Sequence, residues 1–388
     1  MIRKGDPEMA REINRSLVLN YLRNTKQTHR AEIAKALNLT KVTITTIINQ
    51  LIDEGLVKEL GEGKSQKMGG RRPHLISLNN TNNFIIGFDI GKTNTVVALG
   101  DLKGNIIKLV RETTVQDPNV QNVIKHISYL LKKIIKETKI DSKKISGLGI
   151  SAAGIVDSSN GIIELSPDFN WKNIHLRDLL ISELGFPVII DNCTRVMVLG
   201  ERWFGNAMEV KNAFFVNIGY GIGSAVVIDG KIYHNHSEFG HLYVTNKNIK
   251  CYCGKYGCLE AVASGNAIEK AANRILNMKG KTWLTARNVA DMARKENKLA
   301  NKIFFDSGKY IGRSIASVAN LLNPEKIIIG GGVSLAGEIL LDSIIEEFQK
   351  QTMEVIKNNT SIELSKLGMD AGASGAIALG LKHFIFKP

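Results

Sequence analysis

The chain contains the same arrangement twice: an apolar strand, a glycine-bearing turn and a second apolar strand. The first copy covers residues 84–99 and the second covers residues 213–228. A third apolar segment, 326–332, ends in three consecutive glycines. Short apolar runs bounded by glycine are typical of buried strands. Two copies about 130 residues apart, in a chain of 388 residues, therefore predict a duplicated α/β fold with a cleft between its halves.

The glycine turns of these segments are candidates for holding phosphate groups. Glycine lets backbone N–H groups approach an anion, and a carboxylate at the end of the first strand can hold the accompanying metal ion. The candidate nucleotide-binding residues are Asp89, Gly91, Thr93, Gly219, Gly221, Gly223, Gly330, Gly331 and Gly332. The alternative is three unrelated hairpin turns, since many β-hairpins contain the pattern Asp-x-Gly-x-Thr.

A cluster of sulfur and imidazole side chains lies in the second half of the chain. His241 is followed by Cys251, Cys253 and Cys258, so that three cysteines fall within eight residues. One imidazole and three thiolates form the closed tetrahedral set that is typical of structural zinc. Because no ligand position is left for water, we expect this zinc to have a structural role and not a catalytic one. The alternative is three reduced thiols in a loop.

The first 80 residues predict three helices. Apolar residues recur at helical spacing over 11–22, again after Thr28, a potential N-cap, and again after Thr40. Gly55 is suited to end the third helix. The residues expected on the apolar faces are Ile13, Leu17, Val18, Tyr21, Leu22, Ile33, Ala34, Leu37, Ile44, Ile47, Ile48, Leu51 and Ile52.

The second and third of these helices, joined by a short turn at 38–40, predict a helix-turn-helix. Expected strands at 56–60 and 74–78 enclose a basic, glycine-rich segment and predict a charged wing. Small polar side chains on the third helix can fit a major groove, and the wing arginines can enter a minor groove or contact phosphates only. The candidate DNA-binding residues are Thr40, Lys41, Thr43, Thr45, Thr46, Asn49, Arg71 and Arg72. A plain three-helix bundle is the alternative.

The charge distribution also favours a nucleic-acid partner. Residues 1–80 contain 14 Lys and Arg against 8 Asp and Glu, a net charge of +6, and the rest of the chain carries the remaining +8 of the total of +14. Lysine-rich composition also serves solubility, so charge alone leaves both interpretations open. No apolar run approaches the ~18–20 residues of a membrane span, and the first residues lack the apolar stretch of a secretory signal. We therefore expect a cytoplasmic protein with no membrane partner.

Together these features resemble the ROK family of bacterial sugar-responsive repressors and sugar kinases. The helix-turn-helix and its Gly-Gly-Arg-Arg-Pro wing resemble the repressor branch, especially xylose repressors. The resemblance implies a winged helix-turn-helix at 1–80, then a two-lobe actin-like (ribonuclease-H-like) sugar-kinase fold with lobes at 81–200 and 201–388 and a C-terminal helix that packs back on the first lobe. The matching segments are Asp89-Ile-Gly-Lys-Thr93, Ile218-Gly-Tyr-Gly-Ile-Gly223, Glu238-Phe-Gly-His241, Cys251 to Glu260, Asn323 to Gly332 and Ala371-Gly-Ala-Ser-Gly-Ala376.

The resemblance implies a sugar site between the lobes. Its sugar-binding residues would be Asn170, Asn192, Glu238, His241 and Glu260. Carboxylates and amides suit such a ligand because each can engage neighbouring hydroxyl groups. His241 would then serve both the zinc and the sugar, with one ring nitrogen for each.

The sequence departs from the family kinases at their catalytic position. Those kinases have an Asn-Asp pair, whose Asp is the general base for the sugar hydroxyl, where this chain has Asn192-Cys193. Cysteine at its ordinary pKa is a poor substitute base, and Asp191 points elsewhere if it lies on a strand. Ala153 also stands where kinases have proline, and Lys92 where they have glycine. We therefore expect a sugar site without catalytic residues and no use of ATP.

The expected function is that of a repressor that releases operator DNA when a sugar binds. The alternative is a ROK-type sugar kinase that phosphorylates a hexose with ATP, and an activator that needs sugar to bind DNA is a further possibility. Paired recognition helices must meet half-sites about one helical turn apart, so we expect a homodimer or a dimer of dimers. The effector can be xylose or a hexose, because both offer the same hydroxyl contacts.

Overall fold

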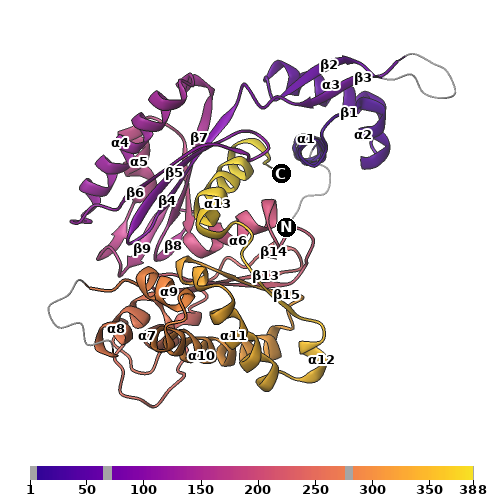
Figure 1. Cartoon of the computed structure of the whole chain (residues 1–388). Coiled ribbons are helices and arrows are strands. Elements are labelled where there is room, and N and C mark those ends of the chain that lie inside the picture. The colour runs from indigo at the N-terminus through magenta and orange to yellow at the C-terminus, as the bar shows by residue number, and fades with distance from the viewer. Residues whose placement is uncertain (1–6, 64–71, 276–282, 388) are drawn as a thin grey trace.

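The computed structural model describes residues 7–63, 72–275 and 283–387 and places a small helical unit beside two α/β lobes (Figure 1). Among these residues, no helix combines the length and the apolarity that crossing a membrane requires. The candidate wing residue Arg71 lies outside the described residues, whereas Arg72 lies inside them.

The small unit is the predicted winged helix-turn-helix. Its strands pair antiparallel in the order β1-β3-β2. Asn38, with φ 53°, takes the left-handed conformation that ends the second helix, and the Thr40 hydroxyl caps the third by accepting the Thr43 N–H at 3.1 Å. The elements are α1 (Pro7–Arg23), β1 (Thr28–His29), α2 (Arg30–Leu37), α3 (Lys41–Asp53), β2 (Val57–Glu62) and β3 (His74–Leu78).

Two details of the prediction for this unit are wrong. The cap of α2 is His29, whose Nδ1 accepts the Glu32 N–H at 3.2 Å, while Thr28 lies in β1. Ile13 and Leu17 are 46% and 45% exposed. The buried face of α1 consists of Ser16, Val18, Leu19 and Leu22. Ile13 and Leu17 therefore lie at the side of this face and not within it.

The first lobe is built on a five-stranded sheet with the order β11-β7-β4-β5-β6. The first predicted hairpin is β4–β5, and β7 and β11 continue the sheet in parallel. Helices α4 and α5 bury their apolar sides against one face. The elements are β4 (Phe84–Ile90), β5 (Asn94–Gly100), β6 (Ile106–Thr113), α4 (Val120–Thr138), β7 (Ile145–Ala152), β8 (Ile155–Asp157), β9 (Ile162–Ser166), β10 (Trp171–Ile174), α5 (Leu176–Leu184) and β11 (Val188–Asn192), with a 3₁₀ turn at Ser142–Lys144 and a small sheet β10-β9-β8.

The second lobe repeats the same topology with the order β14-β13-β12-β15-β16. In both sheets the chain order across the sheet is third, second, first, fourth and fifth strand, which confirms the predicted duplication. Helices α7 to α11 cover the outer face of the second sheet (Figure 1). The elements are β12 (Ala213–Ile218), β13 (Ile222–Ile228), β14 (Lys231–Ile232), η2 (Phe239–His241), α7 (Leu259–Ala263), α8 (Gly265–Ile275), α9 (Ala286–Arg294), α10 (Lys298–Leu322), β15 (Lys326–Gly330), η3 (Gly332–Ala336), α11 (Glu338–Gln351), α12 (Glu354–Lys357), β16 (Ser361–Leu364) and η4 (Gly368–Asp370).

Two helices, α6 (Cys193–Phe204) and α13 (Ala371–Gly380), lie between the two sheets. Helix α13 packs on β4 and β7, α6 packs on β12 and β13, and the two helices pack on each other. The contacts are so close that they require glycine. A methyl group added at Gly149 would lie 1.9 Å from the Ala376 carbonyl oxygen, and one added at Gly375 would lie 2.0 Å from the Val196 carbonyl oxygen.

The winged helix shares an apolar core with the first lobe and the C-terminal segment. The Ser16 hydroxyl donates to the Phe386 carbonyl at 3.2 Å, next to the π-helical turn Leu381–Ile385. The guanidinium of Arg23, on α1, lies 3.9 Å from the centre of the Trp203 ring. Because Trp203 lies near the end of α6, this helix runs past the boundary expected at residue 200 and reaches the winged helix.

We predict that Gly149→Ala destabilises the chain, because the new methyl group must displace α13 from the first sheet. Overpacking of this kind typically costs about 1–3 kcal/mol, which thermal or urea unfolding would measure. Gly332→Ala is the matched control, since nothing lies within 4 Å of the position its methyl group would occupy. Equal stability of the two variants would show that the α13 contact is not tight.

Candidate functional site

A cavity of about 1300 Å³ lies between the lobes, where the glycine turns of both sheets meet. It brings together all the residues that the sequence assigned to sugar binding: Asn170, Asn192, Glu238, His241 and Glu260. It also brings together the glycine-turn residues Asp89, Gly91, Thr93, Gly219, Gly221, Gly223, Gly331 and Gly332. Gly330 is the exception, because it lies within β15, where an added methyl group would be 2.6 Å from the Phe215 ring.

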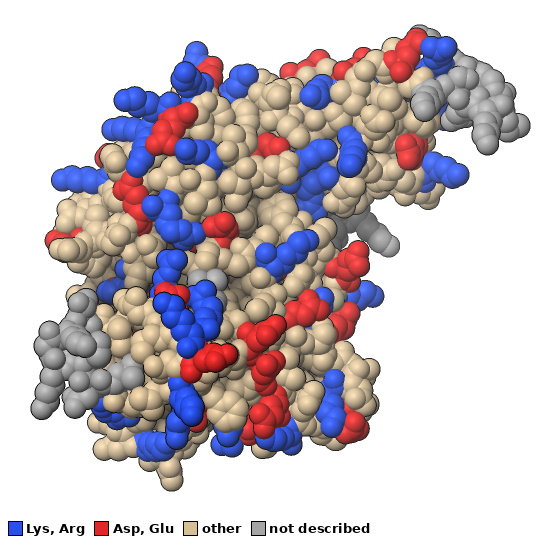
Figure 2. Space-filling model, viewed as in Figure 1, with Lys and Arg blue, Asp and Glu red and all other residues tan. Residues whose placement is uncertain are grey.

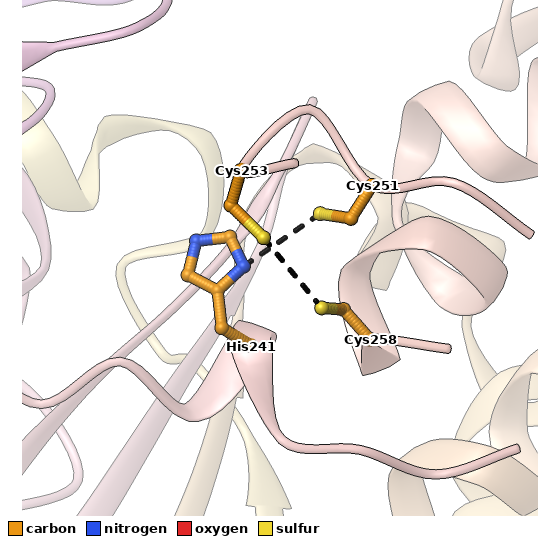
Figure 3. Close-up of side chains that lie close together, drawn as sticks. All are labelled: His241, Cys251, Cys253 and Cys258. Carbon is orange, nitrogen blue, oxygen red and sulfur yellow. Dashed lines mark hydrogen bonds between the residues drawn. The ribbon is translucent and has the colours of Figure 1, made fainter. Parts of the chain in front are cut away.

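The four candidate metal ligands converge beside this cavity (Figure 3). The ligand atoms of His241, Cys251, Cys253 and Cys258 all lie within 4.8 Å of one another. Gly254, with φ +88°, provides the sharp turn between the cysteines, since this backbone conformation is strained for other residues. The sulfur and nitrogen donors and their tight grouping fit a closed tetrahedral zinc site.

The imidazole of His241 faces the thiols with one nitrogen and the cavity residues with the other. Its Nδ1 lies 3.7 Å from the Cys251 sulfur, whereas its Nε2 lies 3.3 Å from the Tyr252 hydroxyl and 3.8 Å from a Glu238 carboxylate oxygen. This orientation leaves Nδ1 for a metal and Nε2 for a hydrogen bond, as the double role of His241 requires.

Glu260 connects the cysteine loop to a glycine turn of the second lobe. It lies on α7, two residues after Cys258, and its carboxylate accepts the Ile222 N–H at 2.8 Å. Burial raises the pKa of Glu260 to about 7. A methyl group added at Gly221 would lie 2.4 Å from the same carboxylate, so glycine at this position has a packing reason apart from any phosphate.

Asn192 is the N-cap of α6, a role that sequence reasoning missed. Its side-chain oxygen accepts the N–H groups of Thr194 and Arg195 at 2.9 and 3.2 Å, and its amide donates to the Gly154 carbonyl at 2.7 Å. An asparagine amide has a second N–H, which remains for a ligand hydroxyl. The Asn-cap signal was present in the sequence, because asparagine is a preferred cap residue.

Asn170 also lines the cavity, in an exposed turn with φ 55°. The turn is anchored by Phe169, which stacks on Trp171 at 4.7 Å between ring centres. The Lys92 ammonium donates to the carbonyl of Asp168 in the same turn. Lys92 therefore ties the first glycine turn to the loop that carries Asn170, which gives this departure from the kinase pattern a structural role.

Cys193 begins α6 and lines the cavity. Burial raises the pKa of the Cys193 thiol to about 12, and the carboxylates of Asp89 and Asp168 add to this shift. The thiol is therefore neutral near pH 7 and cannot accept a proton as the missing aspartate would. Burial also raises the pKa of Asp89, although the Ser151 hydroxyl donates to its carboxylate at 2.6 Å.

Asp191 is turned away from Cys193 and pairs with Arg195 inside the protein. The Arg195 Nε donates to the Asp191 carboxylate at 2.7 Å, and both side chains are less than a tenth exposed. The same guanidinium donates to the Val156 carbonyl in the first lobe at 2.9 Å and to the His234 carbonyl in the second lobe at 3.2 Å. Arg195 therefore links the lobes at the back of the cavity, a contact that no local sequence signal reveals.

The candidate DNA-binding residues of the helix-turn-helix lie on the outer side of α3. Lys41, Thr45, Thr46 and Asn49 are exposed, and Thr43 is half-buried. The basic residues of this unit are partly neutralised, since Arg15 pairs with Glu54, Arg30 with Glu59 and Arg72 with Glu62, at 2.6, 3.0 and 3.7 Å. Accordingly, blue and red side chains are mixed across the face drawn in Figure 2.

Known proteins resemble this chain in sequence and in architecture. A model of the ROK family matches residues 85–383. A xylose repressor of Caldicellulosiruptor bescii is 29% identical, with 99% of each chain covered. The structure of a ROK family transcriptional regulator, described as a homologue of the E. coli MLC protein, superposes with a TM-score of 0.82 at 26% identity over 96% of both chains. A ROK family glucokinase from Streptomyces griseus, solved with glucose and AMPPNP, gives 0.70 at 26% identity over 76% of this chain and 99% of that one.

The fold and the cavity define a two-lobed α/β protein of the sugar-kinase type that carries a winged helix-turn-helix. The chain belongs to the ROK family, and the expected resemblance is confirmed. The two relatives named above that match over nearly the full length are a xylose repressor and a transcriptional regulator. The kinase match covers the smaller share of this chain, in keeping with the family match, which begins after the winged helix.

We predict that the chain as purified without chelator holds one zinc ion, and that Cys258→Ser loses it because the tetrahedral set is then incomplete. Elemental analysis of both proteins would measure this. Cys193→Ser is the matched control, since Cys193 is the one cysteine of the sequence outside the cluster. A zinc-free wild-type chain, or equal zinc in the two variants, would contradict this assignment.

Proposed function

We propose that this chain is a sugar-responsive transcriptional repressor that binds operator DNA through its winged helix and releases it when a sugar fills the cavity. One observation supports this most strongly. A winged helix-turn-helix is joined to a kinase-type cavity whose catalytic base position holds the neutral thiol of Cys193. The 29% identity to a xylose repressor over the full chain makes xylose or a related sugar the first candidate effector.

The sugar would be held by side chains from both lobes. Asn170 and Asn192 offer amide groups from the first lobe, whereas Glu238, His241 and Glu260 offer carboxylates and an imidazole from the second. The metal site would fix the wall that carries His241 and Glu260, because both are tied to the cysteine loop. Zinc bound there would supply positive charge that holds the thiolates together. Its contribution is structural, since all four donors are protein side chains.

The sugar-kinase alternative is favoured by the likeness to a ROK glucokinase. Positioning groups alone supply part of phosphoryl-transfer catalysis, and the glycine turns line the cavity in this chain too. Two observations argue against sugar phosphorylation. The pKa of Cys193 is raised to about 12, and Asp191, the nearest carboxylate along the chain, is engaged by Arg195. We therefore propose that the chain is not an enzyme and does not use ATP.

Helix α6 provides a direct route from the cavity to the DNA-binding unit. Its N-cap Asn192 lines the cavity, and Trp203, 11 residues further along the helix, lies about 16 Å away at 1.5 Å per residue. The Arg23 guanidinium covers the Trp203 ring. Among the described residues, no group accepts a hydrogen bond from the Arg23 Nε or Nη1 atoms. A sugar that moves α6 would therefore change the contact that positions α1 and the recognition helix.

A sugar can shift the DNA-binding equilibrium only by binding one arrangement of the lobes more tightly than the other. In a homodimer or a dimer of dimers, two recognition helices must fit half-sites about one helical turn, ~34 Å, apart. A small rotation of each winged helix would spoil that fit. The expected partners are thus duplex operator DNA, a small sugar and further copies of this chain.

The proposal is tested by DNA affinity with and without sugars. The full-length chain would first select sites from a random-sequence duplex library, and D-xylose and D-glucose would then be titrated into the complex. At least one sugar is expected to weaken binding by roughly 5–150-fold, the usual range of allosteric coupling. A sugar that binds the chain and leaves its DNA affinity unchanged would contradict the proposal, and one that tightens DNA binding would favour an activator.

We predict that the unmodified chain binds sugar without sugar-dependent ATP turnover, because it lacks the base that accepts the proton of the sugar hydroxyl. If the glycine turns still hold ATP, Cys193→Asp restores a carboxylate and raises turnover by up to ~10²–10⁴-fold, and no gain would show that the nucleotide site is lost as well. A coupled ADP assay would measure both, with Cys193→Ser as the control that restores no base. Substantial turnover by the unmodified chain would overturn the repressor-only proposal in favour of a kinase.

We predict that Arg23→Met weakens the coupling between sugar and DNA while sugar affinity stays unchanged. The loss of a cation–π contact is worth roughly two- to thirty-fold in an equilibrium. DNA affinity measured across a sugar titration would report it. Lys309→Met is the matched control, since Lys309 lies 4.4 Å from the Phe305 ring in the second lobe. Unchanged coupling in Arg23→Met would show that α6 does not carry the signal.

A further inference from the structure

The outer side of α3 presents an apolar side chain to solvent. Val42, the second residue of this helix, is 76% exposed. Val42 is not part of the buried face of α3, which consists of Ile44, Ile47, Ile48 and Leu51. In a helix-turn-helix, the first residues of the recognition helix contact base edges. Val42 therefore lies where a base-reading residue is expected, although it can neither donate nor accept a hydrogen bond.

The threonines on the same side of α3 use their hydroxyl protons inside the helix. Thr45 donates to the Lys41 carbonyl at 2.8 Å, and Thr46 donates to the Val42 carbonyl at 3.1 Å. A side chain bonded in this way has no hydroxyl proton left for a base acceptor. The other branch at each Cβ is a methyl group, which adds to the apolar character of this exposed surface.

Asn49 is also restricted as a base reader. Its side-chain oxygen accepts a hydrogen bond from Arg30 at 3.1 Å, and Arg30 is held in place by Glu59 at 3.0 Å. Recognition of adenine by asparagine needs the amide oxygen and nitrogen together. The Arg30 bond occupies one of the two lone pairs of that oxygen and fixes the orientation of the amide, so hydrogen-bonded base reading by this side of α3 is reduced.

We infer that α3 reads thymine through its C5-methyl group, with Val42 as the contact that specifies it. The thymine methyl is the one apolar group that a base pair presents in the major groove, and aliphatic side chains recognise it by contact. The partner is thus duplex DNA with thymine at a defined position of each half-site. This inference rests on the proposed DNA-binding function and identifies a chemical feature of the operator.

The expected effect is modest and measurable. Burying one methyl-sized group is worth about 0.8 kcal/mol, which corresponds to about a fourfold change in affinity. If the protein contacts one thymine methyl in each of two half-sites, the fourfold changes multiply, and loss of both methyl groups weakens binding by roughly 16-fold.

The test combines one change in the protein with one change in the DNA. The full-length chain selects its sites from a random-sequence duplex library, and the preferred thymine of each half-site is then replaced by deoxyuridine, which lacks only the methyl group. The wild-type chain is expected to lose about fourfold affinity per half-site. Val42→Ser is expected to bind the thymine and deoxyuridine duplexes equally, because it has no aliphatic group to contact the methyl.

The comparison of the two proteins cancels any effect of uracil on DNA shape. Since Val42 is exposed, Val42→Ser leaves the core of the winged helix intact, which thermal unfolding would verify. Leu321→Ser is the matched control, because Leu321 is an 82% exposed apolar residue on α10 of the second lobe. It is expected to keep the wild-type response to deoxyuridine.

The outcomes separate this inference from the proposed function. If the library yields no enriched sequence, the DNA-binding function itself fails. If a sequence is enriched but the wild-type chain binds thymine and deoxyuridine equally, the methyl contact is refuted. An equal loss in wild type and in Val42→Ser would also overturn the inference, because the methyl effect would then arise elsewhere.

Discussion

The close contact between α6 and α13 determines how the rest of the molecule is arranged. Each helix packs on the sheet of a different lobe, so their contact joins the lobes, and it is close enough that Gly375 has no room for a methyl group. The contact lies along the middle of α6, at Val196 and Gly200. At the start of α6, Asn192 caps the helix, and both Asn192 and Cys193 line the cavity. Near the end of α6, Trp203 contacts Arg23 of the winged helix. A DNA-binding unit and a ligand cavity are thereby connected by one rigid element.

The cavity combines features of a kinase with contacts that oppose kinase chemistry. Its glycine turns lie where phosphate turns are expected, yet several have other reasons for glycine. Gly221 leaves room for Glu260, and Gly223 leaves room for the Thr194 hydroxyl, which would lie 2.4 Å from an added methyl group. Lys92 is bonded to a neighbouring loop. The polar side chains suited to a sugar line the walls of the same cavity.

The sequence predicted what depends on local patterns. Strand and glycine periodicity predicted both hairpins and the duplication, and the spacing of His241 and the three cysteines predicted their convergence, because a short loop keeps them together. Contacts between distant segments were beyond such patterns. Nothing near Arg195 indicates that it bonds carbonyls of both lobes. The exposure of Ile13 and Leu17 was missed for the same reason, since helical spacing marks an apolar stripe without showing how much of it another element covers.

In the proposed mechanism, sugar and DNA compete through the conformation of one chain. Allosteric coupling is reciprocal, so a sugar that weakens DNA binding must itself bind more weakly to the DNA complex, by the same factor. Calorimetric titration of D-xylose, or of the sugar that releases DNA most strongly, into the free chain and into its complex with selected duplex DNA measures this directly. We expect weaker sugar binding in the complex, by the factor found for DNA release. Equal sugar affinity in the two states would contradict it.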